Sequence, residues 1–449
     1  MQIRKKNYRW WHNSNFLKVQ ILLKIVILLF LFLTWPITLH IAVLESEVVY
    51  LQPLADDWQK RNPNIRINLE PFKTTDSIEE DYTKSFTPNN SISRKYDLVY
   101  MDIIWLPKFA ESGWLRELDE EFTQAELEPF LDNEIKRGRA EKNKLLYRIP
   151  FRTDVGVLFY REDLLKKSSQ PPKTFTELLE ASLEISKNFQ NPNSTFWGYL
   201  WQAGKYEALV TTFLEVLSAY GGCWICPDSA PDKVGLDSQE VIKAIQFLRS
   251  TIDKKVSPPY TGIYEEDIYL RKFKKGEAAF LRSWPDSWAR FNNADDSQIE
   301  GKVGLTQVVG VNNNSAGCLG GWGFGIPKNT RHLKAALRAM KFFTSQEVQR
   351  KFVLESSYLP SRTELFSDPE IQKKYPHFPK MLEIVKNAIN RPQISNYDGV
   401  SKILQCHLSI ALSSDSDLKK IEATMKIAAN KTRNLLNNKK IEQSICENI

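Results

Sequence analysis

Acidic and aromatic side chains stand at the ends of several expected elements, where they could bind a polyhydroxyl ligand. Asp102 directly follows the strand-like run YDLVYM, and Asp154 lies within FRTDVG. Trp284 and Trp322 stand in the segments SWPDSW and GGWGFG. A carboxylate accepts hydrogen bonds from neighbouring hydroxyl groups, and an indole covers the apolar C–H face of a pyranose ring. We therefore expect these four side chains to line one cavity and to bind a sugar there.

The same acids leave an enzymatic alternative open, because two carboxylates can also hydrolyse a glycosidic bond. That chemistry needs carboxyl groups roughly 5 Å or roughly 6.5–9.5 Å apart, a separation that the sequence does not give. The sequence signatures of a P-loop, a serine nucleophile elbow and a zinc protease are absent from the chain. The five histidines are isolated from one another. We therefore expect no catalytic residue, no metal site and no cofactor.

One pair of cysteines is close in sequence. Cys223 and Cys226 stand in GGCWICPD, a turn-like context that lacks the strand–helix order of a redox motif. A zinc site would need a second pair at a suitable spacing, and the other three cysteines do not supply it. The pair is therefore expected either to form a local disulfide in an oxidising compartment or to remain as two thiols.

Alternating strand-like and helical patterns must position these side chains. Strands are expected at 37–45, 65–69 and 96–101, and a helix is expected at 48–61, where the following Asn-Pro step ends it. This order predicts an α/β lobe with a largely parallel sheet.

A second region begins near residue 147 with another strand pattern. Thr174 is expected to cap the helix that follows it, with Glu177 as its capping-box partner. Further helical patterns lie at 205–220, 238–254 and, with a clear amphipathic spacing, 333–343.

Composition excludes some functional classes. The chain has 449 residues, 42% hydrophobic and 26% charged, which is typical of a globular protein and predicts two or three domains. The net charge of +7 comes mainly from residues 1–44, which hold six basic residues and no acid; the remainder has 55 basic and 54 acidic residues. A nearly neutral body does not offer the broad positive surface that a nucleic acid needs, so we expect no nucleic-acid partner.

The first 36 residues resemble an export signal or membrane anchor. A basic segment precedes the apolar run IVILLFLFLTW at 25–35, and no small-x-small cleavage site or lipidation cysteine follows it. Both an uncleaved anchor and a cleaved signal remain open. In either case the basic flank predicts that the body lies outside the cytoplasm, in the periplasm or an equivalent compartment and tethered to the inner membrane if the segment is retained.

The chain also resembles the bacterial extracellular solute-binding proteins of ABC sugar importers, of the maltose- and trehalose-binding type. The matching stretches keep their order over about 37–405, and include YDLVYMDIIWLPKFAESGWLRELD (96–119), YRIPFRTDVGVLFYREDLL (147–165), FKKGEAAFLRSWPDSWA (273–289), LGGWGFGIPKN (319–329) and NRPQISNYDGVS (390–401). The resemblance implies a periplasmic-binding-protein-like α/β fold, in which two α/β lobes are joined by hinge crossings around an interlobe ligand cleft.

On this resemblance we expect a division of the chain into a leader and two discontinuous lobes. After the leader (1–36), the first lobe comprises 37–150 and 319–358, and the second comprises 151–318 and the mostly helical 359–449. The crossings are expected near 150–154, 317–325 and 356–361.

The resemblance implies a monomer that captures a di- or oligosaccharide or a related glycoside and delivers it to ABC permease subunits that work with a separate ATPase. A glycoside hydrolase-like enzyme and a membrane-tethered sugar sensor are the alternatives on the same scaffold.

The resemblance also implies ligand-binding residues and marks departures from the family pattern. The expected ligand-binding residues are Glu47, Asp102, Arg152, Asp154, Trp284, Asp286, Gly321, Trp322 and Arg391. Arg152 and Asp286 stand where trehalose and maltose binders carry aromatic residues. The arginine that those binders carry after the second strand is replaced within the acidic stretch 76–81, and Glu80 or Asp81 is expected to take its place.

Overall fold

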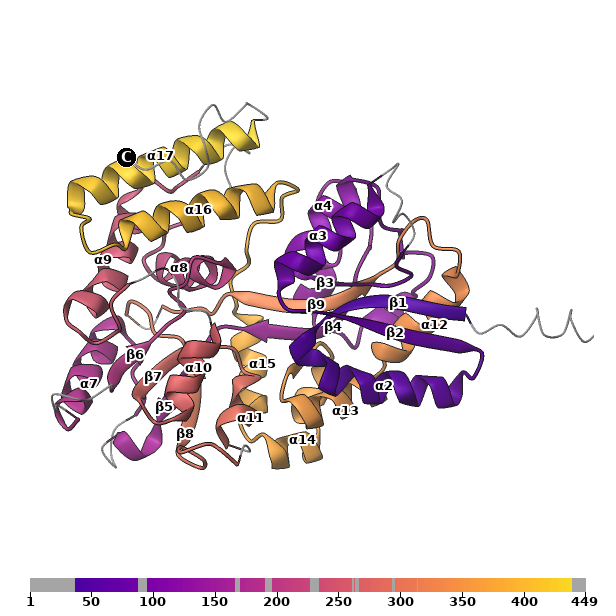
Figure 1. Ribbon diagram of the computed structural model, residues 1–449, viewed down its shortest axis with the longest axis horizontal. Coiled ribbons are helices and arrows are strands. Elements are labelled where there is room, and N and C mark those ends of the chain that lie inside the picture. The colour runs from indigo at the N-terminus through magenta and orange to yellow at the C-terminus, as the bar shows by residue number, and fades with distance from the viewer. Residues whose placement is uncertain are drawn as a thin grey trace, which may run out of the picture.

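The computed structural model describes residues 37–87, 95–165, 170–189, 196–226, 234–260, 262, 266–292, 295–312 and 314–437. The expected leader, 1–36, lies outside these residues. Among the residues described, no helix has the length and apolar character needed to cross a membrane. The chain forms two α/β lobes that lie side by side, with strands β4 and β9 passing between them (Figure 1).

The first lobe is built mainly from the N-terminal part of the chain. Its elements are β1 (Ile37–Leu44), η1 (Glu45–Glu47), α2 (Val48–Arg61), β2 (Ile65–Phe72), α3 (Thr75–Phe86), β3 (Val99–Asp102), η2 (Ile103–Trp105), α4 (Leu106–Glu111), α5 (Gln124–Leu127), α6 (Asp132–Arg137), α12 (Leu333–Phe343) and α13 (Gln346–Ser356). Strands β1 and β2 pair in parallel along their whole length.

The second lobe holds most of the remaining helices. Its elements are β5 (Val157–Arg161), η3 (Glu162–Leu164), α7 (Phe175–Lys187), β6 (Trp197–Leu200), α8 (Glu207–Ala219), α9 (Gln239–Asp253), α10 (Glu266–Lys274), β7 (Ala278–Ser283), α11 (Ser287–Asn292), β8 (Val303–Gln307), η4 (Thr363–Ser367), α14 (Pro369–Lys374), α15 (Phe378–Lys386), α16 (Tyr397–Ala411) and α17 (Leu418–Leu436). Its sheet has the strand order β6-β7-β5-β8.

The predicted largely parallel sheet is wrong for the strands that join the lobes. The central sheet of the first lobe has the order β10-β4-β9-β3, and β9 (Leu319–Gly325) runs antiparallel to both β3 and β4 (Ile149–Val155). Strand β10 (Leu359–Pro360) is antiparallel to β4. The reason lies in the connectivity, because β4 leaves the first lobe while β9 returns to it from the second.

The change from one sheet to the other lies at Gly156, not at the expected boundary between residues 150 and 151. Strand β4 stays paired with β9 as far as Val155, and β5 of the second lobe starts at Val157. A Cβ atom on Gly156 would stand 1.8 Å from Oε1 of Glu215 and 2.4 Å from Arg282 Nη2. The crossing therefore needs glycine, because the Glu215–Arg282 ion pair packs directly against its backbone.

Two separate hydrophobic cores accompany the two sheets. One draws its buried residues from 39–151 and 322–358, and the other draws them mainly from 155–319 and 359–429. The two lobes therefore have largely separate cores, with a few first-lobe residues, such as Ile103 and Leu131, packed into the core of the second.

Several element predictions are confirmed. The helices expected at 48–61 and 333–343 are α2 and α12, with the expected ends. Thr174 caps α7 through the predicted capping box with Glu177. Here local signals, namely apolar spacing and a cap, were enough to predict where the helices lie.

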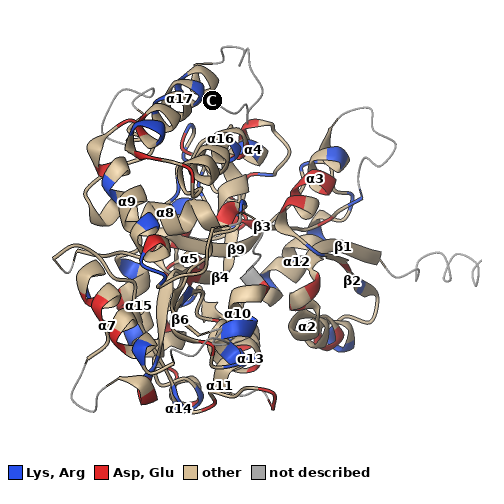
Figure 2. Cartoon of the chain, turned by 60° about the vertical axis from the view of Figure 1, so that its left-hand side comes forward, with Lys and Arg blue, Asp and Glu red and all other residues tan. Residues whose placement is uncertain are grey.

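Charge is mixed over the surface. Figure 2 shows basic and acidic segments interspersed on the helices of both lobes. Many form exposed ion pairs, such as the pair between Arg61 on α2 and Glu347 on α13.

In the second lobe, Cys223 and Cys226 are joined by a disulfide.

The ring nitrogens of one half-buried histidine have no hydrogen-bond partner. His377 packs against Trp288 at 4.4 Å and Phe378 at 5.2 Å between ring centroids. Both of its ring nitrogens are buried and make no hydrogen bond in the structure. Burial lowers the pKa of His377 from its ordinary value of 6.5 to about 4, because the positive form loses its hydration.

We predict that His377 weakens the fold at acidic pH. His377 takes up a proton near pH 6.5 in the unfolded chain and only near pH 4 in the folded chain. The free energy of unfolding is therefore unaffected above pH 6.5 and decreases as the pH falls from 6.5 toward 4. The loss should be on the order of 2–3 kcal/mol. In the His377→Phe variant this part of the acid-induced loss should be absent when the free energies of unfolding in urea are compared at pH 7 and pH 4.5. An equal acid loss in both proteins would contradict the assignment.

Candidate functional site

The strand register places four of the nine expected ligand-binding residues on one face of the central sheet. Across β3-β9-β4, Asp102 stands opposite Trp322, and Trp322 stands opposite Arg152. Asp154 lies two residues further along β4, opposite Gly320. Because directly paired residues and residues two apart in a strand share a face, these side chains point the same way.

A buried ion pair on the opposite face of β9 requires glycine at position 321. Gly321 has a φ of +146°, which only glycine adopts readily. A Cβ atom there would lie 2.7 Å from Oε1 of Glu134, a buried carboxylate that pairs with Arg148 and accepts a hydrogen bond from Thr153. Gly321 therefore acts by keeping β9 close to this ion pair, so that Trp322 keeps its place on the ligand-facing side.

Arg152 is the centre of one polar cluster. Its Nη2 donates to Glu47 at 2.6 Å, its Nη1 to Asp154 at 2.9 Å and its Nε to the Tyr100 hydroxyl at 3.1 Å. Tyr100 in turn donates to Glu47 at 2.7 Å. All four residues are buried. The guanidinium thus neutralises carboxylates that would be costly to bury alone.

Aromatic rings enclose the same guanidinium. Its carbon lies 4.2 Å from the ring centroid of Tyr358 and 5.6 Å from that of Trp322, both within range of a cation–π interaction. Asp286 of the second lobe faces this cluster, and burial raises the pKa of its carboxyl group against the opposing effect of Arg290.

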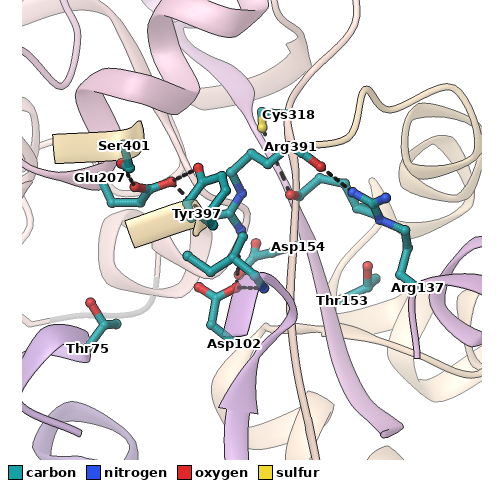
Figure 3. Close-up of polar contacts among 12 residues, drawn as sticks. Thr75, Asp102, Arg137, Thr153, Asp154, Glu207, Cys318, Arg391, Tyr397 and Ser401 are labelled. Carbon is teal, nitrogen blue, oxygen red and sulfur yellow. Dashed lines mark hydrogen bonds and ion pairs between the residues drawn. The ribbon is translucent and has the colours of Figure 1, made fainter. Parts of the chain in front are cut away.

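Arg391 joins the two lobes. Its Nη2 lies 3.2 Å from Asp102, at the end of β3, and its Nη1 lies 3.0 Å from Glu207, at the start of α8 (Figure 3). Arg391 is only 4% exposed. The loop that carries it is held by Arg137, which donates to the Arg391 carbonyl oxygen. A single cation therefore bridges carboxylates from opposite sides of the interlobe face.

Glu207 accepts further hydrogen bonds from α16. The Tyr397 hydroxyl donates to it at 2.5 Å and the Ser401 hydroxyl at 2.6 Å (Figure 3). Burial raises the pKa of Glu207, although Arg391 opposes the shift. This dense set of donors fixes the orientation of the carboxylate.

An interlobe pocket lies beside this second cluster. One wall comes from α3, the end of β3 and α4, and the other from α8 and α16 of the second lobe. Its lining residues are Thr75, Asp76, Glu79, Asp102, Ile104, Trp105, Lys108, Glu207, Ser395, Tyr397, Asp398, Ser401, Lys402 and Gln405. The carboxylates, hydroxyls, amide and two aromatic rings give it the donors, acceptors and flat faces that a sugar or polyol needs.

The nine expected residues are therefore divided between two neighbouring places. Asp102 lines the pocket, and Arg391 pairs with two of its carboxylates. Asp154 and Trp322 are not among the lining residues, because both contact Arg152 instead. Glu47 and Arg152 form that cluster, and Asp286 faces it. Gly321 lies on the opposite face of β9. Trp284 is half-buried, and its ring centroid lies 4.4 Å from the guanidinium carbon of Arg282.

The acids of α3 that line the pocket are not the two expected to take the place of the arginine. Asp76 and Glu79, rather than Glu80 or Asp81, face the pocket. Glu80 is on the exposed side and pairs with Lys84, while Asp81 accepts a hydrogen bond from Tyr96. At 100° per residue, residue 81 lies about 160° around the helix from residue 79, so Asp81 is on the opposite side of α3 from Glu79.

Sequence reasoning also missed residues of the second lobe. Glu207, Tyr397 and Ser401 line the pocket, and their only sequence signal is their position near the starts of α8 and α16. Among the described residues, no group of histidine, cysteine or acidic side chains is arranged to hold a metal ion.

Comparison with known proteins agrees with this geometry. Residues 43–350 match the family model described as bacterial extracellular solute-binding protein. This chain belongs to that family. A probable ABC transporter-binding protein of Deinococcus radiodurans is 28% identical over 353 residues, which cover 77% of this chain and 81% of that protein.

Solved structures of the family share the fold. The maltose-bound MalE3 of T. maritima superposes with a TM-score of 0.81 at 30% identity, covering 89% of this chain and 100% of that one. A solute-binding protein of Agrobacterium radiobacter K84 in complex with ribitol gives a TM-score of 0.76 at 22% identity, covering 89% and 98%. The second likeness concerns the fold alone.

We predict that the buried Arg152–Glu47 pair contributes far more stability than an exposed pair of the same geometry. Both Arg152–Glu47 and Arg61–Glu347 have N–O distances of 2.6 Å, but only the first is buried. Glu47→Gln should lower the free energy of unfolding by about 3 kcal/mol, because the buried guanidinium of Arg152 then loses the negative charge of its main ion-pair partner. Glu347→Gln, the matched control, should have little effect. Equal effects in urea unfolding would contradict the prediction.

Proposed function

We propose that this protein is the solute-binding protein of an ABC-type carbohydrate importer. It captures a sugar or polyol in the interlobe pocket and presents it to membrane permease subunits whose ATPase is a separate chain. The observation that carries the proposal is a pocket whose carboxylates and hydroxyls come from both lobes, with Asp102 on one side and Glu207 and Ser401 on the other. The likeness to the maltose-bound MalE3 supports the carbohydrate class.

Closure of the lobes is the proposed mechanism. A ligand that hydrogen-bonds to Asp102 and to Glu207 at once makes contacts in the closed form that it cannot make when the lobes separate. Its differential affinity therefore raises the population of the closed form. Arg391 contacts both carboxylates as well, so it fixes their positions and neutralises charge that would otherwise oppose closure.

The N-terminal segment, residues 1–36, has a role in export in this proposed function. We propose that residues 1–36 export the body and, if they are not removed, tether it as a monomer to the inner membrane. The basic residues before the apolar run at 25–35 support this orientation. N-terminal sequencing of the mature protein tests the tether: a chain that starts at residue 1 supports it, and a chain that starts after residue 35 contradicts it.

We predict that Asp102→Asn weakens sugar binding by about 10- to 100-fold, the usual effect of losing a charged hydrogen-bond acceptor. The measurement is isothermal titration calorimetry with the best ligand found for the unchanged protein. Glu80→Gln is the matched control, because Glu80 lies on the exposed side of α3, outside the pocket. The same affinity in the Asp102 variant and the control would contradict the site.

A turnover assay separates a binding protein from the glycosidase alternative. Prolonged incubation of the protein with glycosides should return the bound sugar intact, because a solute-binding protein breaks no bond. Accumulation of hydrolysis products that disappears in the Asp102 variant would contradict the transport assignment.

A further inference from the structure

The Arg152 side chain donates hydrogen bonds to three neighbouring side chains at the interlobe face. Glu47 and Asp154, two carboxylates expected to accept hydrogen bonds from sugar hydroxyls, accept them from the two Nη atoms of Arg152. The Tyr100 hydroxyl accepts the hydrogen bond from Nε and donates its own to Glu47. These groups lie in the cluster, outside the set that lines the pocket.

The aromatic surface at this place is covered in the same way. The guanidinium lies 4.2 Å from the ring centroid of Tyr358 and 5.6 Å from that of Trp322. A sugar ring stacks on an aromatic face at a similar separation, so a pyranose and this guanidinium compete for the same space. Trp322 is also covered by Trp105, at 5.2 Å between ring centroids.

Moving Arg152 aside for a ligand would be costly. Glu47 is fully buried and has Arg152 as its ion-pair partner, and Asp286 is a further acid facing the cluster. A neutral sugar cannot replace a cation among these acids, and an unpaired buried carboxylate strongly destabilises a protein. The guanidinium therefore stays in place when the ligand binds.

Space for a ligand lies in the neighbouring pocket. The pocket beside Arg391 is lined by Asp102 from one lobe and by Glu207, Tyr397 and Ser401 from the other. Its aromatic rings, Trp105 and Tyr397, are both almost completely buried, so recognition there relies on hydrogen bonds to carboxylates and hydroxyls more than on stacking.

We propose that Arg152 is a specificity-determining residue that fills one ring position of the cleft and restricts the ligand to a single-ring sugar or an alditol bound between Asp102 and Glu207. This inference rests on the proposed carbohydrate-binding function and narrows its substrate class. It differs from the expectation of a di- or oligosaccharide drawn from the sequence.

The first test is the length preference of the unchanged protein. Titration calorimetry with glucose, mannitol, ribitol, maltose and maltotriose should show the best single-ring sugar or alditol binding at least about tenfold more tightly than maltose or maltotriose, because Arg152 covers the aromatic face and pairs with the carboxylates that a second ring would use. Tighter binding of maltose or maltotriose would overturn this inference and leave the proposed function intact. Binding of none of the five would count against both.

The second test replaces Arg152 by an aromatic residue. The double variant Glu47→Gln/Arg152→Tyr removes the cation together with its main partner charge and restores a ring. The ratio of its affinity for maltose to its affinity for the best single-ring ligand should rise several-fold to about tenfold, the range expected for one stacking contact. An unchanged ratio of the two affinities in a folded variant would overturn the inference.

The matched control makes the same two changes on the surface. Arg61→Tyr/Glu347→Gln alters an exposed pair of equal N–O distance, 2.6 Å, far from the pocket lining. It should leave both affinities unchanged. If the Arg152 double variant does not fold, the length series of the unchanged protein still decides between the two outcomes.

Discussion

A bridge of opposite charges across the lobe interface is the interaction on which the rest of the site depends. Arg391 contacts Asp102 from the first lobe and Glu207 from the second, and it is almost completely buried. Burying these carboxylates without a cation would be prohibitively costly. With the cation in place they can face each other across a narrow pocket and still accept hydrogen bonds from a neutral ligand, and this allows closure to be driven by binding.

The fold supplies the geometry through the antiparallel crossing strands. The register across β3-β9-β4 aligns Asp102, Trp322 and Arg152 on one face, and glycines permit the close backbone approach that this register requires at positions 156 and 321. Both crossings pass beside buried ion pairs, Glu215–Arg282 at Gly156 and Glu134–Arg148 at Gly321.

How much the sequence predicts depends on whether the signal is local. The ends of α2 and α12 and the cap at Thr174 follow from spacing and capping chemistry, and they are confirmed. Glu47, Arg152 and Asp154 were identified through the family resemblance, but their mutual pairing was not, because the Arg152–Glu47 contact joins residues 105 apart in the chain and depends on the tertiary fold. Glu207 was missed altogether: nothing in its local sequence distinguishes it from any other acid at the start of a helix, and only the tertiary fold brings it to Arg391.

The most direct test of this account is a crystal structure of the protein with the tightest-binding sugar or alditol. The account predicts hydroxyl groups of the ligand within hydrogen-bond distance of Asp102 and Glu207, with the guanidinium of Arg152 still paired to Glu47. A ligand stacked on Trp322 in the place of that guanidinium, or bound outside the interlobe pocket, would contradict it.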